Sequence, residues 1–214
     1  MSARSESLDV VILPPEEIAW EAITASRLLA RQFASPLLLD GTTSLPHISL
    51  YHIAVGQKKR AAFGERLREI AARAQAGELH VTGIRLYREF GSIAIEMSKP
   101  RWLQRLYLRI IHETSELRDP RFDSHRAWGY ERLSPGQRRW TDRYGTPLVG
   151  RFFIPHITVG IIPDRDQLKA AAALTSAPRC SFKVSELVIC EQGSHHTCSR
   201  VKERLPLGGL QLIR

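Results

Sequence analysis

Short apolar runs alternate along the first half of the chain with longer stretches of helical periodicity. Residues 8–13 are apolar except for one aspartate, which predicts a buried strand. Residues 14–33 show helical spacing behind two prolines and two glutamates, which favour the start of a helix. Residues 46–54 are rich in β-branched and aromatic side chains and predict a second strand. Residues 58–76 carry apolar side chains at i, i+4 and i+7 and predict a second helix.

Two more strands and a third helix follow. Residues 79–90 and 92–97 predict strands joined by a turn at Gly91, and Pro100 opens a helix with an apolar stripe. A polar stretch then extends over residues 118–150. Beyond it, a strand, a short helix and two strands are predicted at residues 152–162, 164–175, 182–191 and 199–206.

The order strand, helix, strand, strand thus occurs twice, at about residues 46–97 and 155–206. Chance likeness between two generic segments is the alternative explanation. We expect a single domain over residues 1–214 with an α+β fold. It should be bilobal, with two pseudo-symmetric, antiparallel-rich sheets and flanking helices around a central cleft.

The chain is basic, which bears on its partners. Lysine and arginine number 31 against 22 acidic residues, a net charge of +9. Arginine supplies 25 of these cations, and its planar guanidinium suits phosphate, so nucleotides or nucleic acid are expected partners. The alternative is that the arginines lie on ordinary solvated faces.

Compartment and redox state are predicted from what the chain lacks. No apolar run approaches the roughly 18 residues of a membrane helix. Residues 1–9 lack the apolar core of a signal peptide, so we expect a cytoplasmic protein with no membrane partner. Cysteines occur at Cys180, Cys190 and Cys198, an odd number that implies no disulfide framework.

Each predicted repeat begins with the same five-residue pattern. The pattern reads Pro-His-Ile-Ser-Leu from residue 46 and Pro-His-Ile-Thr-Val from residue 155. Because side chains alternate along a strand, His47 and Ser49 should share one face, as should His156 and Thr158. A pseudo-two-fold relation would bring the two pairs to face each other across a cleft.

Two histidines and two hydroxyls suit phosphoester chemistry. One imidazole can deprotonate the attacking oxygen while the other protonates the leaving oxygen, since the ordinary histidine pKa is about 6.5. The hydroxyls can donate to non-bridging phosphate oxygens. No metal-ligand spacing surrounds either motif, so we expect neither a metal nor another cofactor.

The two His-x-[Ser/Thr]-hydrophobic motifs resemble those of the two-histidine (2H) phosphoesterase superfamily, which includes bacterial 2′-5′ RNA ligase-like proteins and cyclic phosphodiesterases. The resemblance implies a bilobal fold over nearly the whole chain. It implies metal-independent action on 2′,3′-cyclic phosphates, related cyclic nucleotides or 2′-5′ linkages. By the same resemblance His47 and His156 are the acid and the base, in either order, and Ser49 and Thr158 bind phosphate. The first motif has serine where threonine is commoner.

Strand alternation places one further aromatic beside the first motif. Tyr51 is expected on the face of His47 and Ser49, where it could stack on a base; a packed aromatic at the rim is the alternative. His52 is expected on the opposite face, with a structural role or exposed to solvent.

Residues 118–151 interleave aromatic side chains with arginines, including Arg143 and Tyr144. This mixture suits a flap that binds an anionic substrate, with these two residues as contacts. The alternative is a long connection packed by its own aromatics.

The sequence favours a metal-independent phosphodiesterase or reversible 2′-5′ RNA ligase that acts on a nucleotide or RNA terminus, with no obligate protein partner. Three alternatives stay open. The first is a non-catalytic RNA- or nucleotide-binding module on the same fold. The second is a phosphodiesterase for sugar cyclic phosphates in phosphonate metabolism, suggested by a loose likeness in residues 133–153. The third is a zinc hydrolase that uses Cys190, His195, His196 and Cys198, although the two histidines could equally be exposed turn residues.

Overall fold

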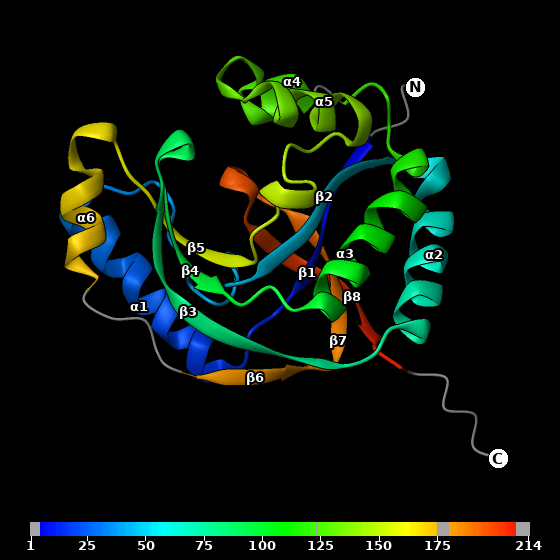
Figure 1. The fold of residues 1–214 in the computed structure, drawn as a ribbon, viewed down its shortest axis with the longest axis horizontal. Helices are drawn as coiled ribbons and strands as arrows, with labels where there is room; N and C mark the ends of the chain where they lie inside the picture. Colours follow the sequence, from blue (N-terminus) through cyan, green and yellow to red (C-terminus); the bar gives the residue numbers. More distant parts are fainter. Residues whose placement is uncertain (1–4, 123, 175–179, 209–214) are drawn as a thin grey trace.

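Two antiparallel sheets of four strands each form the centre of the protein (Figure 1). The computed structural model describes residues 5–122, 124–174 and 180–208. The first sheet has the order β2 (Ile48–Gly56), β1 (Ser5–Ile12), β7 (Glu186–Gln192), β8 (Cys198–Pro206). The second has the order β5 (His156–Ile161), β4 (Ser92–Met97), β3 (Gly77–Tyr87), β6 (Ser181–Val184). The predicted α+β fold with two antiparallel sheets is confirmed.

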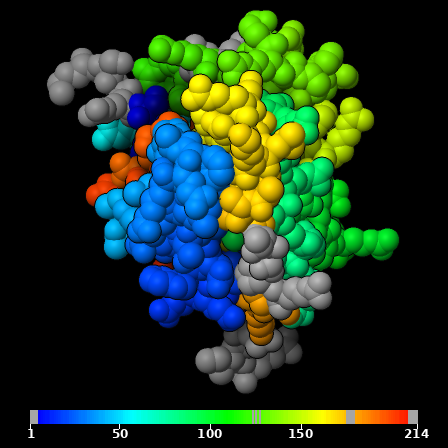
Figure 2. Space-filling model, turned by 90° about the vertical axis from the view of Figure 1, so that its left-hand side faces the viewer, coloured from blue at the N-terminus to red at the C-terminus, as the bar shows by residue number. Residues whose placement is uncertain are grey.

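Helices pack against both sheets. Their bounds are α1 (Glu16–Phe33), α2 (Arg60–Arg73), α3 (Arg101–Thr114), α4 (Ser124–Trp128), α5 (Pro135–Tyr144) and α6 (Gln167–Ala173). α2 and α3 contact the first sheet, whereas α1 and α6 contact the second. From the side, α6 (yellow) lies beside α1 and the segment that follows it (blue) (Figure 2). Within the described ranges, no helix combines the length and apolar character needed to span a membrane.

One predicted strand is in fact two strands of different sheets. β6 pairs with the start of β3, whereas β7 pairs with β1. The single strand predicted at residues 182–191 is therefore wrong, because the chain passes from one sheet to the other at Ser185. The pattern of side chains does not reveal this break, because the break depends on which strand each half pairs with.

Three boundaries also differ from those predicted. The strand expected from residue 152 starts at His156, because residues Gly150–Phe152 form a 3-10 turn. Lys99 Nζ donates to the carbonyls of Gly150 and Phe153 at 3.0 and 2.6 Å, which fixes this turn. The helix expected over 58–76 ends at Arg73. The helix expected over 164–175 has α6 as its core, and residue 175 lies outside the described residues.

Close packing holds the segment that leads into β5. The Tyr107 ring of α3 stacks on Phe153 with ring centroids 3.8 Å apart. Its hydroxyl donates to the Leu148 carbonyl at 2.6 Å and accepts from the Gly150 N–H at 3.1 Å. Tyr107 therefore ties the approach to β5 to the helical layer of the first sheet.

Replacing Tyr107 by phenylalanine removes both hydrogen bonds and leaves two partly buried backbone groups without this partner. We expect Tyr107→Phe to lower the free energy of unfolding by about 1–3 kcal/mol, measured by urea denaturation. Tyr130→Phe is the matched control, because the Tyr130 hydroxyl bonds to Asp142 at the surface and should matter little. Equal effects of the two variants would contradict the role assigned to Tyr107.

Candidate active site

A cavity of about 400 Å³ lies between the two sheets. All four motif residues, His47, Ser49, His156 and Thr158, line it. Ser49 lies in β2 of the first sheet, with His47 directly before that strand, whereas His156 and Thr158 lie in β5 of the second sheet. The cavity is therefore where the two halves meet. Much of the remaining wall is aromatic: Tyr87, Phe90, Trp128, Phe152 and Phe153.

The two histidines are held by the same backbone device. Nδ1 of His47 donates to the Leu45 carbonyl at 2.7 Å, and Nδ1 of His156 donates to the Ile154 carbonyl at 2.7 Å. In each case the carbonyl belongs to the residue two positions earlier. A neutral imidazole that donates through Nδ1 keeps Nε2 as an acceptor, so both rings have a basic Nε2.

Burial keeps both histidines neutral near pH 7. It lowers the pKa of His47 to about 4, against a smaller opposing effect of the hydrogen bond to Leu45. Burial also lowers the pKa of His156, but the hydrogen bond to Ile154 and the negative charge of Glu96 oppose it. Glu96 stands directly across from His156 in the pairing of β4 with β5. The two halves of the site are thus electrostatically unequal.

A β-bulge follows the hydroxyl in both motif strands. Val10 and Val11 pair with Tyr51 and Ser49, which leaves an extra residue at position 50. Ile93 and Ala94 pair with Gly160 and Thr158, which leaves an extra residue at position 159. A bulge inverts the alternation of side chains beyond it. His52 and Ile161 therefore line the cavity, whereas their preceding neighbours turn away from it.

This inversion corrects the expectations for Tyr51 and His52. Tyr51 is 1% exposed and lies in the core, where its hydroxyl donates to the Tyr144 carbonyl at 2.7 Å. Tyr144 is itself buried, and Arg143 is exposed with its guanidinium over the Tyr144 ring. None of the three is among the residues that line the cavity. His52, expected on the other face, is a wall residue.

A buried carboxyl that the sequence analysis missed joins the first motif to this histidine. Asp9 of β1 is fully buried, and its Oδ2 lies 2.6 Å from Ser49 Oγ, 3.3 Å from His52 Nδ1 and 3.7 Å from His47 Nε2. Burial raises the pKa of Asp9 to about 8, against the opposing hydrogen bond from Ser49. The available signal was that this residue is the one polar position in an apolar strand.

The tip of the β7–β8 hairpin also folds into the site. Gln192 Nε2 lies 2.7 Å from His52 Nδ1 and 2.9 Å from His196 Nδ1, and so bridges the two rings. The Trp128 ring of α4 stacks on His196, with centroids 4.7 Å apart and an interplanar angle of 6°. His195, His196 and Thr197 line the cavity. The two histidines of the turn therefore form part of the wall of the site.

A disulfide closes this tip. Cys190 and Cys198 are bonded to each other, and both are fully buried. The odd number of cysteines predicted no disulfide framework, yet this pair is bonded, because the β7–β8 hairpin brings two cysteines eight residues apart within bonding reach. The bond also occupies both sulfur ligands that the zinc hypothesis requires. Among the described residues, no group of three or more His, Cys, Asp or Glu is placed to hold a metal ion.

Residues 118–151 combine the two roles considered for them. Trp128, Gln137, Leu148 and Arg151 line the cavity, as a flap would. Most of the segment nonetheless packs on itself: Trp140 stacks on Tyr144, and several arginines bond to neighbouring carbonyls or carboxylates. α4 and α5 accordingly sit over one end of the sheets (Figure 1).

Sequence comparison identifies a family over most of the chain. The model of the 2′-5′ RNA ligase superfamily matches residues 14–196. A comparison with curated protein sequences finds no match.

Several solved structures share the fold at low sequence identity. LigT of E. coli without ligand is 19% identical, with a TM-score of 0.57 over 95% of this chain and 98% of that chain. LigT complexed with 3′-AMP is also 19% identical, with a TM-score of 0.54 over 95% of this chain and 99% of that chain. TT0787 of Thermus thermophilus is 14% identical, with a TM-score of 0.57 over 94% of this chain and 98% of that chain.

The disulfide is expected to hold His196 and Thr197 against the cavity. Alkylation of the unfolded protein should modify one cysteine per chain before reduction and three after it, as counted by intact mass. Removing the bond with a Cys190→Ser, Cys198→Ser double variant should lower stability by about 2–3 kcal/mol through added freedom of the unfolded loop. Modification of all three cysteines without reduction would contradict the pairing.

Proposed function

We propose, since the chain belongs to the 2′-5′ RNA ligase superfamily, that it is a metal-independent phosphodiesterase of the two-histidine type. Its proposed substrates are 2′,3′-cyclic phosphates at RNA termini or in small cyclic nucleotides. The same site would form a 2′-5′ linkage when a ribose 5′-hydroxyl replaces water as the nucleophile: the 5′-oxygen bonds to phosphorus as the bond from phosphorus to the 3′-oxygen breaks. The reverse of this step cleaves the linkage.

The observation that carries this proposal is the matched pair of histidine–hydroxyl units on one cavity. Each unit has an imidazole clamped through Nδ1 and a hydroxyl two residues later, and the units come from opposite sheets. An in-line displacement at phosphorus needs a proton acceptor on one side and a proton donor on the other. Two imidazoles on the wall of one cavity can meet this need.

The unequal surroundings of the histidines favour one assignment of roles. His47, with the strongly lowered pKa, is the proposed base: its Nε2 takes a proton from water as the water oxygen bonds to phosphorus. His156 is the proposed acid: its Nε2–H protonates the ribose oxygen as the bond from phosphorus to that oxygen breaks. Glu96 favours the protonated form of His156, and a bound phosphate anion favours it further.

The ligands of a structural neighbour support a nucleotide substrate. E. coli LigT has been solved with 3′-AMP and with phosphate. The aromatic wall here, with Trp128 and Tyr87 among its residues, offers faces for a nucleobase. Thr158, which lines the same cavity, is the proposed donor of a hydrogen bond to a phosphate oxygen.

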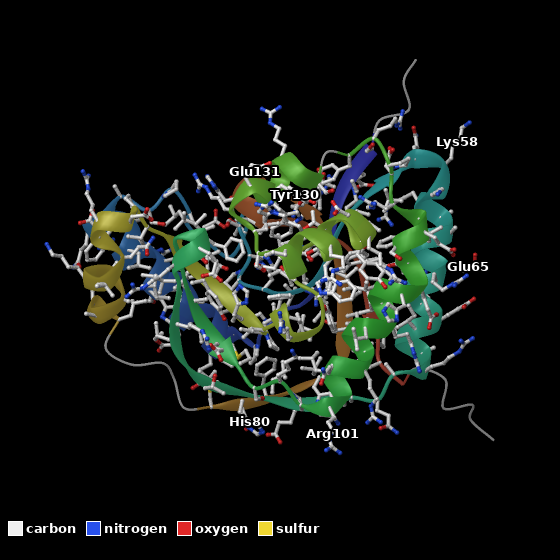
Figure 3. All side chains as sticks on the ribbon, turned by 45° about the horizontal axis from the view of Figure 1, so that its top comes forward. Lys58, Glu65, His80, Arg101, Tyr130 and Glu131 are labelled. Atoms are coloured by element: carbon white, nitrogen blue, oxygen red, sulfur yellow. A yellow bond between two sulfur atoms is a disulfide. The ribbon has the colours of Figure 1, made fainter. Side chains whose placement is uncertain are left out.

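Removing either histidine should abolish turnover. We expect His47→Ala and His156→Ala each to lower kcat by about 10²–10⁴-fold on the best of a panel of 2′,3′-cyclic nucleotides and 2′-5′-linked oligonucleotides, assayed in EDTA. His80→Ala is the matched control, because His80 is an exposed strand residue that points away from the molecule (Figure 3). Full activity of either site variant would refute the mechanism.

The panel also separates the proposal from its alternatives. If nothing is turned over while labelled RNA binds equally to wild type and both variants, the non-catalytic binding module is the better account. If a sugar cyclic phosphate is added to the panel and is the one compound turned over, the alternative of a sugar cyclic phosphate phosphodiesterase in phosphonate metabolism is favoured.

The lowered histidine pKa values predict an acidic optimum for kcat/KM in the free enzyme. The base works only above its pKa of about 4, and the acid works only below its own pKa, which burial sets under the ordinary 6.5. Glu96→Gln removes the charge that raises the pKa of His156, so the alkaline limb should move to lower pH while the acid limb stays in place. Arg85→Gln breaks the same 3.0 Å ion pair but keeps the carboxylate, and should not move the limb downward. A shift of the acid limb by Glu96→Gln would reverse the assigned roles.

A further inference from the structure

The single O–H of Ser49 can donate to Asp9 or to a ligand, but not to both. Thr158, the hydroxyl of the other motif, has no such competing carboxyl within the part of the chain that the structure describes. A serine has a single O–H, and Ser49 Oγ lies 2.6 Å from Asp9 Oδ2. If Asp9 is a carboxylate, it can only accept, so the Ser49 hydrogen points to Asp9 and away from the cavity. Ser49 would then offer only lone pairs to a phosphate oxygen, which repel it.

In the second half of the site, a serine stands at the position that corresponds to Asp9. In the pairing of β1 with β2, Asp9 stands opposite His52; in the pairing of β4 with β5, Ser92 stands opposite Ile161. Ser92 thus occupies the position that corresponds to Asp9. Among the described residues, the Thr158 hydroxyl has no hydrogen-bond partner, which leaves its hydrogen available to a ligand.

We propose that Asp9 is a positioning residue that acts in its protonated form. Its carboxyl O–H donates to Ser49 Oγ, and this turns the Ser49 hydrogen into the cavity towards a phosphate oxygen. The proposal deepens the proposed function, on which it rests, because it assigns the Ser49 hydroxyl to phosphate binding only while Asp9 is neutral.

The surroundings of Asp9 favour the neutral carboxyl. Oδ1 is buried and has no hydrogen-bond partner among the described residues, and burying an unpaired oxygen costs more free energy when it is charged than when it is neutral. The titratable groups that face it are His47, next to β2, His52 within β2 and, beyond Gln192, His196 of the hairpin tip. On the β7 side it faces Cys190, which is bonded to Cys198.

Distances decide which group receives the proton of Asp9. Ser49 Oγ is 2.6 Å from Oδ2, whereas His52 Nδ1 is at 3.3 Å and is already engaged by Gln192 at 2.7 Å. Burial lowers the pKa of His52 well below its ordinary value, so this ring supplies no positive charge to ionise Asp9. The carboxyl hydrogen therefore has one close acceptor, Ser49.

Asparagine tests the proposal, because its amide donates as the protonated carboxyl does but cannot ionise near neutral pH. We expect Asp9→Asn to match wild type in kcat/KM at pH 6 and to exceed it as pH rises, by about tenfold between pH 7 and pH 9. Both enzymes share the pH dependence that the two histidines impose, so this dependence cancels in the ratio of their kcat/KM values. Asp9→Ala, which lacks the donor, should lose about tenfold or more at pH 6.

Ser49→Ala provides the control for mechanism. In that background the further change Asp9→Asn should have no pH-dependent benefit, because no hydroxyl remains to be oriented. A flat ratio of Asp9→Asn to wild type from pH 6 to pH 9, or the same benefit without Ser49, would overturn the proposal.

Two measurements keep this test separate from the proposed function. The affinity for inorganic phosphate, measured by calorimetry, should show the same ratio between Asp9→Asn and wild type even if no panel substrate is turned over. Thermal stability gives the second. A carboxyl whose pKa rises from 3.8 to about 8 on folding makes the wild type lose stability, relative to Asp9→Asn, as pH rises between those values. Parallel Tm curves would show that Asp9 is ionised, and the proposal would fail.

Discussion

One extra residue in each motif strand is the constraint on which the rest of the site depends. In each motif, the histidine and the hydroxyl residue that precede the bulge (residue 50 or 159) face the cavity. Beyond the bulge, the alternation of side chains between the two faces of the strand is inverted. His52 consequently reaches the cavity, and Tyr51 becomes a core residue bonded to the Tyr144 carbonyl. In the second strand, the bulge turns Gly160 towards α1. A Cβ there would lie 2.5 Å from Leu29 Cδ1, so glycine lets the helix pack against the strand.

Burial rather than net charge governs the chemistry of the cavity. The chain carries +9, yet Arg85 and Arg151 are the cationic side chains that the described part of the chain contributes to the cavity wall. The pKa values of His47, His52 and His156 are lowered, and that of Asp9 is raised, in each case mainly by loss of water. A site of neutral imidazoles and hydroxyls is therefore poised to gain positive charge only when an anionic ligand enters.

The tip of the β7–β8 hairpin and residues 118–151 support one side of this site. Trp128 stacks on His196, Gln192 bridges His196 to His52, and Asp9 joins His52 to Ser49. These contacts link α4, the β7–β8 tip, β2 and β1, which are far apart in the sequence. The disulfide between Cys190 and Cys198 limits how far the tip can move from the cavity.

Local sequence pattern predicted most of the helices and strands and both histidine–hydroxyl units. Hydrophobic periodicity is local, so it located most strands and helices within a few residues, and the repeated Pro-His-Ile-Ser/Thr pattern carried the family resemblance. The remaining features of the site arise from strand pairing. Four features depend on which strands pair. They are the bulge that turns His52 rather than Tyr51 towards the cavity, the passage between sheets at Ser185, the disulfide, and the contact of Asp9 with Ser49. Pairing is set by contacts between residues distant in the chain, and no local pattern encodes it.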